Sequence, residues 1–105
     1  MDILYINDDP EEVALFVEAL NTADRSIKFS YAVGTSDALR KLNNYLSLPD
    51  KIFVACRSGS KGGLDCVKHI KASHGLKHVP VVAVSSSLTP SLVDALNKLG
   101  VYSIF

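Results

Sequence analysis

Polar side chains that could hold a cation or a phosphoryl group follow three apolar segments of this chain. They come after segments 2–6, 51–56 and 79–84: Asn7, Asp8 and Asp9, then Arg57, then Ser85 and Ser86. Carboxylate oxygens are the usual protein ligands of Mg²⁺, often together with phosphate. In open α/β sheets, ligands bind outside the carboxyl ends of the strands. The order of these residues therefore predicts one polar site, provided that the three segments are parallel strands of one sheet.

The segments that such a sheet needs alternate with amphipathic stretches. Apolar or alternating runs predict five strands, at 2–6, 26–33, 51–56, 79–84 and 101–105. The run 79–84 (VPVVAV) is the most apolar, as is typical of a fully buried parallel strand. Strands that alternate with helices imply a parallel sheet with right-handed crossovers. We therefore expect a doubly wound α/β fold, with residues 1–105 forming one domain.

Four helices are expected between the strands. The first begins at Asp9 and Pro10 and the last at Thr89 and Pro90, because a capping residue precedes a proline that fits the first helical position. Thr35 is expected to cap the second helix. Apolar residues recur at helical spacing in each: Val13, Phe16, Val17 and Leu20; Ala38, Leu39, Leu42, Tyr45 and Leu46; Leu64, Val67 and Ile70; Leu92, Leu96 and Leu99.

Glycines are expected to mark the breaks between these elements. The polar, glycine-rich stretch 57–63 (RSGSKGG) is predicted to be a loop. It lacks the spacing of a phosphate-binding Walker motif. The third helix is expected to end near Gly75, and Gly100 stands where a residue that ends the fourth helix belongs.

The composition indicates one globular domain and excludes several classes of protein. The chain has 105 residues, 48% of them hydrophobic, and its 11 basic and 11 acidic residues leave no formal net charge. A nucleic-acid-binding module normally carries a basic excess, so no direct DNA or RNA contact is expected. No apolar run approaches the roughly 20 residues of a membrane helix, and no signal peptide is recognised. We expect a cytoplasmic domain in which Cys56 and Cys66 are reduced thiols.

Four motifs, in their order along the chain, resemble the receiver domain of response regulators, the CheY-like family of two-component signalling. They are ILYINDDP (3–10), LPDKIFVA (48–55) followed by a Gly-Gly turn, HVPVVAVSSS (78–87) and ALNKLGVYSIF (95–105). Each motif is short, and their order and spacing over almost the whole chain carry the resemblance. It implies a flavodoxin-like sheet of strand order 2-1-3-4-5. Relative to the family, the chain is truncated before the fifth helix.

The resemblance assigns roles to individual positions of this chain. In the family, an aspartate at the end of strand three accepts a phosphoryl group from a histidine kinase, and that position falls on Ala55. The two acidic positions that hold Mg²⁺ fall on Asn7 and Asp8. The switch hydroxyl position falls on Ser85 and the switch aromatic position on Ile104. The lysine position that contacts the phosphoryl group lies beyond the last residue.

These substitutions imply a degenerate site. Ala55 removes the acceptor, because a methyl group cannot form an acyl phosphate. Asp8 and the amide of Asn7 imply weak Mg²⁺ binding at most, since Mg²⁺ is usually held by one or two carboxylates plus phosphate. We therefore expect neither a catalytic residue nor a cofactor. One hypothesis is that Arg57 pairs with Asp8 or Asp9 and replaces the metal by an internal ion pair; the alternative is a solvated Arg57.

The expected function is that of a receiver-type signalling module of a two-component phosphorelay that no longer accepts phosphate and is not an enzyme. It would act through a protein partner, either a histidine kinase or an output domain, or through a homodimer. One alternative is a structural dimerisation domain of a larger kinase or regulator. A small-ligand-binding flavodoxin-like domain is disfavoured, because Asn7, Asp8 and Asp9 would repel a phosphate at the end of strand one.

Overall fold

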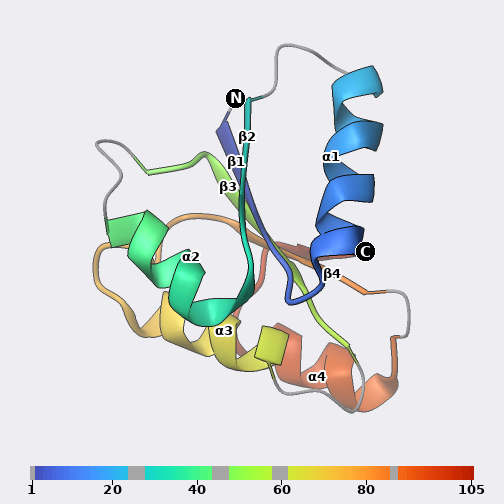
Figure 1. Ribbon diagram of the computed structural model, residues 1–105. Coiled ribbons are helices and arrows are strands. Elements are labelled where there is room, and N and C mark those ends of the chain that lie inside the picture. Colours follow the sequence, from blue (N-terminus) through green and yellow to red (C-terminus); the bar gives the residue numbers. More distant parts are fainter. Residues whose placement is uncertain (1, 24–27, 44–47, 58–61, 86–87) are drawn as a thin grey trace.

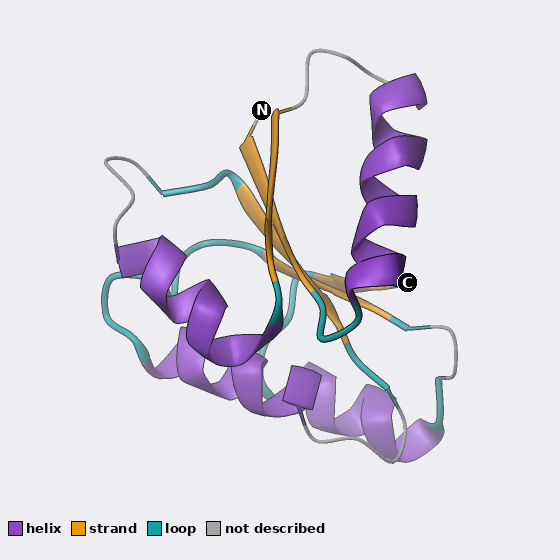
Figure 2. Ribbon diagram, in the orientation of Figure 1, coloured by secondary structure: helices purple, strands orange, loops and turns teal. Residues whose placement is uncertain are grey.

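The fold is an open sheet of parallel strands with helices on both faces (Figures 1 and 2). The computed structural model describes residues 2–23, 28–43, 48–57, 62–85 and 88–105. Its elements are β1 (Asp2–Ile6), α1 (Pro10–Ala23), β2 (Lys28–Ala32), α2 (Gly34–Asn43), β3 (Lys51–Ala55), α3 (Gly62–Ala72), β4 (Val81–Val84), α4 (Pro90–Lys98) and β5 (Ser103–Ile104). The strand order is β2-β1-β3-β4-β5. The predicted doubly wound fold and its strand order are confirmed.

The parallel register brings the carboxyl ends of the central strands to one edge of the sheet. Ile6 of β1 lies opposite Val54 of β3, and Ala55 lies opposite Val84 of β4. Each of these strands therefore releases its following residues at the same edge. This arrangement collects the polar residues of the predicted site.

The main core lies between the sheet and the layer formed by α2, α3 and α4, which Figure 1 shows on the side of the sheet away from α1. One set of alternating strand residues faces this layer, as the two-residue period of a strand requires. Burying each large apolar side chain contributes roughly 1.5–3 kcal/mol. The largest fully buried apolar side chains are Leu4, Ile52, Ile70, Leu96, Val54, Val67 and Val81.

An aromatic cluster holds α1 on the other face of the sheet. The ring of Phe16 stacks on that of Tyr5, with the ring centroids 4.0 Å apart and the planes 8° from parallel. Phe16 also meets Phe29 and Phe53 edge-on, at 6.5 and 5.9 Å. These contacts place α1 over β1, β2 and β3, and therefore set the position of its first turn beside the polar edge.

Two helix starts follow the predicted capping chemistry. Asp9 accepts the N–H of Glu11 on its Oδ1 (2.9 Å), and Thr89 accepts the N–H of Leu92 on its Oγ1 (3.3 Å). Pro10 and Pro90 follow as the first residues of α1 and α4. Of the four helices in the described part of the chain, none has both the length and the apolar character needed to cross a membrane.

The predicted cap of α2 is wrong. The helix begins at Gly34, so Thr35 lies inside its first turn instead of preceding it. Gly34 has a φ of 86°, a conformation that glycine adopts without strain. The carboxylate of Asp37 instead accepts the N–H of Val33 (3.0 Å), which satisfies a backbone donor at the helix entrance.

Helix α3 begins earlier than predicted. Residues 57–63 were expected to be a loop, yet Gly62 and Gly63 form the first turn of α3. The helix ends at Ala72, close to the predicted end near Gly75. Glycine at position 63 lets the helix start in direct contact with the end of β3.

Strands β4 and β5 are shorter than predicted. The N–H of Val79 bonds to Leu76 (3.0 Å) in a turn, and Pro80 has no N–H, so β4 begins only at Val81. Gly100 has a φ of 77° and residue 102 lies in a bend, so only residues 103–104 of the predicted strand 101–105 run beside β4. Several predicted positions lie outside the described residues: strand residues 26–27, Tyr45 and Leu46 of the second stripe, loop residues 58–61, and Ser86 and Ser87.

Candidate functional site

A buried amide, Asn7, lies at the centre of the polar edge. Its residue is 3% exposed, although asparagine is mostly found exposed. Its Nδ2 donates to the hydroxyl of Tyr5 (3.1 Å) and to Oε2 of Glu12 (2.8 Å), and its Oδ1 accepts the N–H of Asp9 (3.0 Å). Buried polar groups require such partners. Asn7 therefore ties the end of β1 to the first turn of α1.

Arg57, two residues after β3, reaches across to the same turn of α1. Its Nη2 lies 2.6 Å from Oε2 of Glu12 and 3.9 Å from Oδ2 of Asp9. It also donates to Oδ1 of Asn7 at 3.4 Å. Asp8 forms no ion pair with Arg57, although both residues lie within the described part of the chain. Arg57 thus links the ends of β1 and β3 to α1.

Glu12 is the residue of this network that the sequence analysis did not single out. It follows Asp9 by three residues, so both lie on the same face of the first turn of α1. That spacing was the available signal, because only residues 7–9 separate the end of β1 from α1 and so keep the first turn of α1 close to the strand ends. Hydrogen bonds from Asn7 and then from Arg57 hold the pKa of Glu12 below its ordinary value of 4.5.

The pair between Arg57 and Glu12 is expected to be weak and to disappear in acid. Both side chains are more than 40% exposed, so a double-mutant cycle with Arg57→Gln and Glu12→Gln should give, at pH 7, a coupling no larger than that of an ordinary surface ion pair. The lowered pKa of Glu12 means that this contribution is present above its unfolded value of 4.5 and is lost as pH falls through the folded value.

Urea unfolding of the wild type, the two single variants and the double variant at pH 7 and at pH 3 measures the coupling between Arg57 and Glu12 and its loss in acid. The exposed pair between Asp94 and Lys98 on α4 is the matched control, since it makes a 3.0 Å contact remote from the polar edge. A coupling between Arg57 and Glu12 that persists unchanged at pH 3 would show that the two side chains interact by packing and not by charge.

A cavity of about 350 Å³ lies beside this network, between α1 and the ends of β3 and β4. Its apolar lining comes mainly from Tyr5, Leu15, Phe16 and Val84, and Ala55 adds its methyl group. Its polar lining comes from Glu12, Arg57 and Ser85. Burial raises the pKa of Tyr5, so its hydroxyl stays protonated while it accepts from Asn7. The structure thus brings Ala55, Arg57 and Ser85 to one cavity, with Asn7 behind it.

The residues present do not fit a Mg²⁺ site. The amide oxygen of Asn7 already accepts the N–H of Asp9 and a bond from Arg57, and Ala55 offers no oxygen. Asp8 is exposed and its Oδ1 lies towards Gly34, 3.5 Å from where a side chain at that glycine would begin. The described residues contain no group of three side chains arranged to hold a metal ion.

The two switch positions lie in different places. Ser85 lines the cavity, and its N–H donates to the carbonyl of Phe105 (2.8 Å), which fixes the loop after β4 to the last strand. Ile104 is half-buried and packs against the core on the α2–α4 side. Its side chain does not line the cavity.

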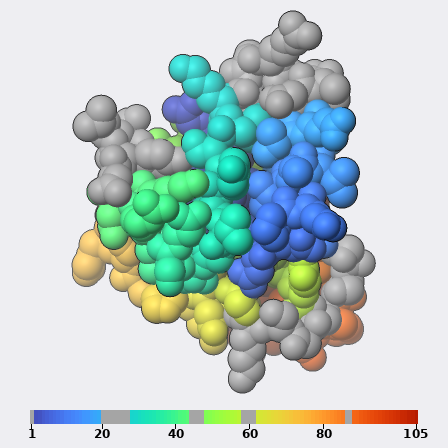
Figure 3. Space-filling model, viewed as in Figure 1, coloured from blue at the N-terminus to red at the C-terminus, as the bar shows by residue number. Residues whose placement is uncertain are grey.

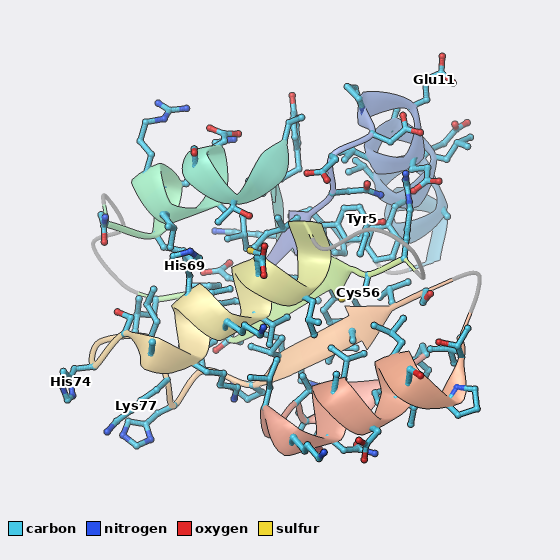
Figure 4. The ribbon with its side chains drawn as sticks, turned by 90° about the horizontal axis from the view of Figure 1, so that it is seen from below. Tyr5, Glu11, Cys56, His69, His74 and Lys77 are labelled. Carbon is cyan, nitrogen blue, oxygen red and sulfur yellow. The ribbon has the colours of Figure 1, made fainter. Side chains whose placement is uncertain are left out.

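The thiols and imidazoles stand apart from the candidate site chemistry. Cys56 and Cys66 are free and buried, and burial raises the pKa of Cys56 to about 11, so neither a disulfide nor a reactive thiolate is indicated. His69 and His74 are exposed. Figure 4 shows both on the part of α3 and its following turn that lies away from Tyr5.

Comparison with known proteins was informative at the level of structure alone. No family model and no curated protein matches the chain. The bacteriophytochrome response regulator AtBRR superposes with a TM-score of 0.83 at 24% identity, covering 99% of this chain and 79% of that one. The phosphorylated cyanobacterial phytochrome response regulator RcpA gives 0.83 at 23% identity, with 99% and 78% covered.

The Mn²⁺-bound form of the response regulator Rcp1 gives a TM-score of 0.80 at 23% identity, over 99% of this chain and 78% of that one. At these identities the likeness establishes the fold. The chain therefore has the fold of response-regulator receiver domains, as its sequence motifs predicted.

Proposed function

We propose that this chain is a receiver-type signalling module of a two-component system that acts by binding protein and not by accepting phosphate. The observation that carries the proposal is Ala55, a methyl group at the end of β3 in the cavity that Arg57 and Ser85 also line. A receiver fold with an apolar residue at this point keeps its surfaces but has no nucleophile there. Because one fold can host several functions, the proposal depends on the site and not on the fold.

The network of Asn7, Glu12 and Arg57 supports this proposal. In place of a metal between carboxylates, the guanidinium of Arg57 lies against Glu12 and Asp9. The cation is then part of the chain, so a positive charge stands beside these carboxylates without bound Mg²⁺. A module of this kind would present the same charges at this edge of the sheet with or without Mg²⁺ and phosphate.

The partner would be a histidine kinase, an output domain or a second copy of this chain. The alternative function is that of a structural dimerisation domain of a larger kinase or regulator. Such a domain would also act by contacting another protein through its surface. A phosphate-binding flavodoxin-like site is less well supported, because Asp8 and Asp9 stand at the end of β1 where such a ligand would sit.

Titration with Mg²⁺ and beryllofluoride, a stable mimic of a phosphoryl group on aspartate, tests the loss of the switch. Beryllofluoride needs a carboxylate oxygen to complete its coordination, and Ala55 has none. The amide NMR signals of Asp8, Arg57 and Ser85 are therefore expected to move no more than in a titration with MgCl₂ alone. Saturable shifts of these signals would contradict a phosphorylation-independent module.

A further inference from the structure

The end of α3 and the turn that follows it carry a cluster of basic side chains that does not line the cavity. Of the eleven residues from 68 to 78, six are lysine or histidine: Lys68, His69, Lys71, His74, Lys77 and His78. We call these six residues the basic surface. The sequence has no aspartate or glutamate between Asp65 and Asp94. A chain without formal net charge thus gathers basic residues in one segment.

Backbone hydrogen bonds order the turn that carries part of this surface. The N–H of Lys77 donates to the carbonyl of Ser73 (2.9 Å), and the N–H of Val79 donates to that of Leu76 (3.0 Å). The side chains of Leu76 and Val79 are buried in the main core, which anchors the turn to it. All of the basic surface is exposed except Lys71, which is half-buried. A partner would therefore meet a preformed backbone, which lowers the ordering cost of binding.

The basic surface lies at the opposite edge of the sheet from the candidate site. Helix α3 begins beside the end of β3, where Gly63 approaches the carbonyl of Ala55, and it runs back to the edge at which β4 begins with Val81. Figure 4 shows His74 and Lys77 projecting outward from the turn after α3. Figure 3 shows the same segment (yellow to orange) on the molecular surface at the lower left. A partner bound here would not need to contact the cavity.

Within the described ranges, none of the six basic side chains forms an ion pair with an acidic residue. The ion pairs found in those ranges involve other cations, Arg40, Lys41, Arg57 and Lys98. Asp65 lies one turn before the basic surface on α3, yet it belongs to none of these pairs. Because described carboxylates do not neutralise it, the basic surface can attract an anionic partner.

A hollow of about 270 Å³ lies along the exposed face of α3 beside the basic surface. Its lining residues recur at helical spacing: Asp65, Lys68, His69 and Ala72. The methyl group of Ala72 offers an apolar contact to the methylene groups of an incoming side chain, and Lys68 and His69 offer donors to its carboxylate. Asp65 at the other end would repel a carboxylate. The hollow therefore favours an acidic side chain that lies towards Ala72 and the following turn.

We propose that the basic surface binds an acidic segment of a partner protein. A lysine ammonium has three hydrogen-bond donors and an imidazole adds an N–H donor, so both can pair with the carboxylates of aspartate and glutamate. A contact of this kind is small and rich in charge, which is typical of weak, salt-dependent complexes. The inference rests on the proposed function for the class of ligand alone, since the charges do not depend on the residue at position 55.

The residue types of this segment favour protein over nucleic acid or lipid as the ligand. Residues 62–85 contain no arginine, which would bind phosphate through two parallel hydrogen bonds, and no phenylalanine, tyrosine or tryptophan on which a base could stack. None of the exposed large apolar side chains of the described chain lies in residues 62–85, so this surface has no apolar anchor for a membrane. Pairing with carboxylates needs neither feature.

An NMR titration of the whole chain with a deca-glutamate peptide tests the proposal. The amide signals of residues 68–78 are expected to shift in a saturable manner at low salt, while those of Asp8 and Ser85 stay in place. Added salt should weaken the binding, because it screens charges that are exposed. The absence of a saturable shift of residues 68–78 at low salt would overturn the proposal.

Two double variants separate this surface from net charge. Lys68→Gln with Lys77→Gln should raise the dissociation constant of the peptide about tenfold, because two charge contacts are lost. Lys28→Gln with Arg40→Gln is the matched control, since it removes the same charge from exposed residues of β2 and α2, and it should leave the dissociation constant nearly unchanged. Equal weakening by the two double variants would overturn the proposal.

Two further titrations test the class of ligand. A single-stranded oligodeoxynucleotide and vesicles of anionic phospholipid replace the peptide. Shifts of residues 68–78 that either causes at lower concentration than the peptide would overturn the proposal in favour of a phosphate-bearing ligand. Phosphoryl uptake by a chain that still binds the peptide would contradict the proposed function and support this inference, so the two can fail separately.

Discussion

The wild-type chain is expected to gain no phosphoryl group during incubation with acetyl phosphate and Mg²⁺. Transfer to a receiver requires a carboxylate oxygen that attacks phosphorus and displaces acetate, while nearby cations neutralise the transferred charge. Ala55 supplies no such oxygen in the cavity between Arg57 and Ser85. Intact-protein mass spectrometry measures the outcome directly, because the covalent product carries the mass of one phosphoryl group.

Two variants locate the cause of this inactivity. Ala55→Asp restores the nucleophile but leaves Asp8 as the only carboxylate of the two metal positions. Adding Asn7→Asp is expected to raise phosphoryl uptake further, by about tenfold or more over Ala55→Asp, because Mg²⁺ is held by one or two carboxylates plus phosphate and the variant supplies a second carboxylate at the metal positions. Circular dichroism must show that both variants fold, since Asn7 is buried and bonded to Tyr5.

Each other outcome has a definite meaning. Phosphorylation of the wild-type chain would show that the acceptor is not at position 55, and peptide mapping would identify the residue. A folded double variant that takes up no phosphate would show that Arg57, and not the missing carboxylates, keeps the site closed. Replacement of Arg57 by Gln in the double variant would then be the decisive comparison.

The fold could be predicted from local patterns because each element carries its own signal. Segment 2–6 was predicted with the bounds that β1 has, and the caps Asp9 and Thr89 act as their sequence context indicates. Most of the errors fall where the local backbone geometry at a glycine or a proline overrides the side-chain pattern. Residues 101–105 are mostly apolar and contain strand-forming side chains, yet the left-handed Gly100 and the bend that follows leave only two residues in β5.

The candidate site was predicted less completely, for a physical reason. Parallel strands bring their carboxyl ends together, so the proximity of Asn7, Ala55 and Ser85 follows from strand order. The partner of a long side chain cannot be predicted from strand order, because Arg57 can reach any carboxylate within several ångströms. Its 2.6 Å contact with Glu12 depends on the position of α1, which the stacking of Phe16 on Tyr5 sets.

Substitution of Gly63 by alanine is expected to destabilise the chain by about 3 kcal/mol, at the upper end of the cost of overpacking. A Cβ at this position would lie 2.2 Å from the carbonyl oxygen of Ala55 and 2.9 Å from Cα of Cys56. These are backbone atoms of β3 and its end, so they cannot turn aside as a flexible side chain could. The helix would have to move away from the sheet, and the loss of 3 kcal/mol corresponds to a fall in Tm on the order of 15 °C.

The intrinsic helix preference of alanine acts in the opposite direction, which makes the result diagnostic. In an open helical position, glycine to alanine stabilises by up to about 1 kcal/mol, so a destabilised Gly63→Ala variant must report the contact with β3. Gly75→Ala is the matched control, since nothing lies within 4 Å of its added methyl, and its effect should stay within about 0.5 kcal/mol. Thermal unfolding of both variants shows whether Gly63→Ala lowers the Tm while Gly75→Ala leaves it nearly unchanged. Equal stability of the two would mean that α3 is free to shift at the end of β3, and the position of Arg57 would then not be fixed by that packing.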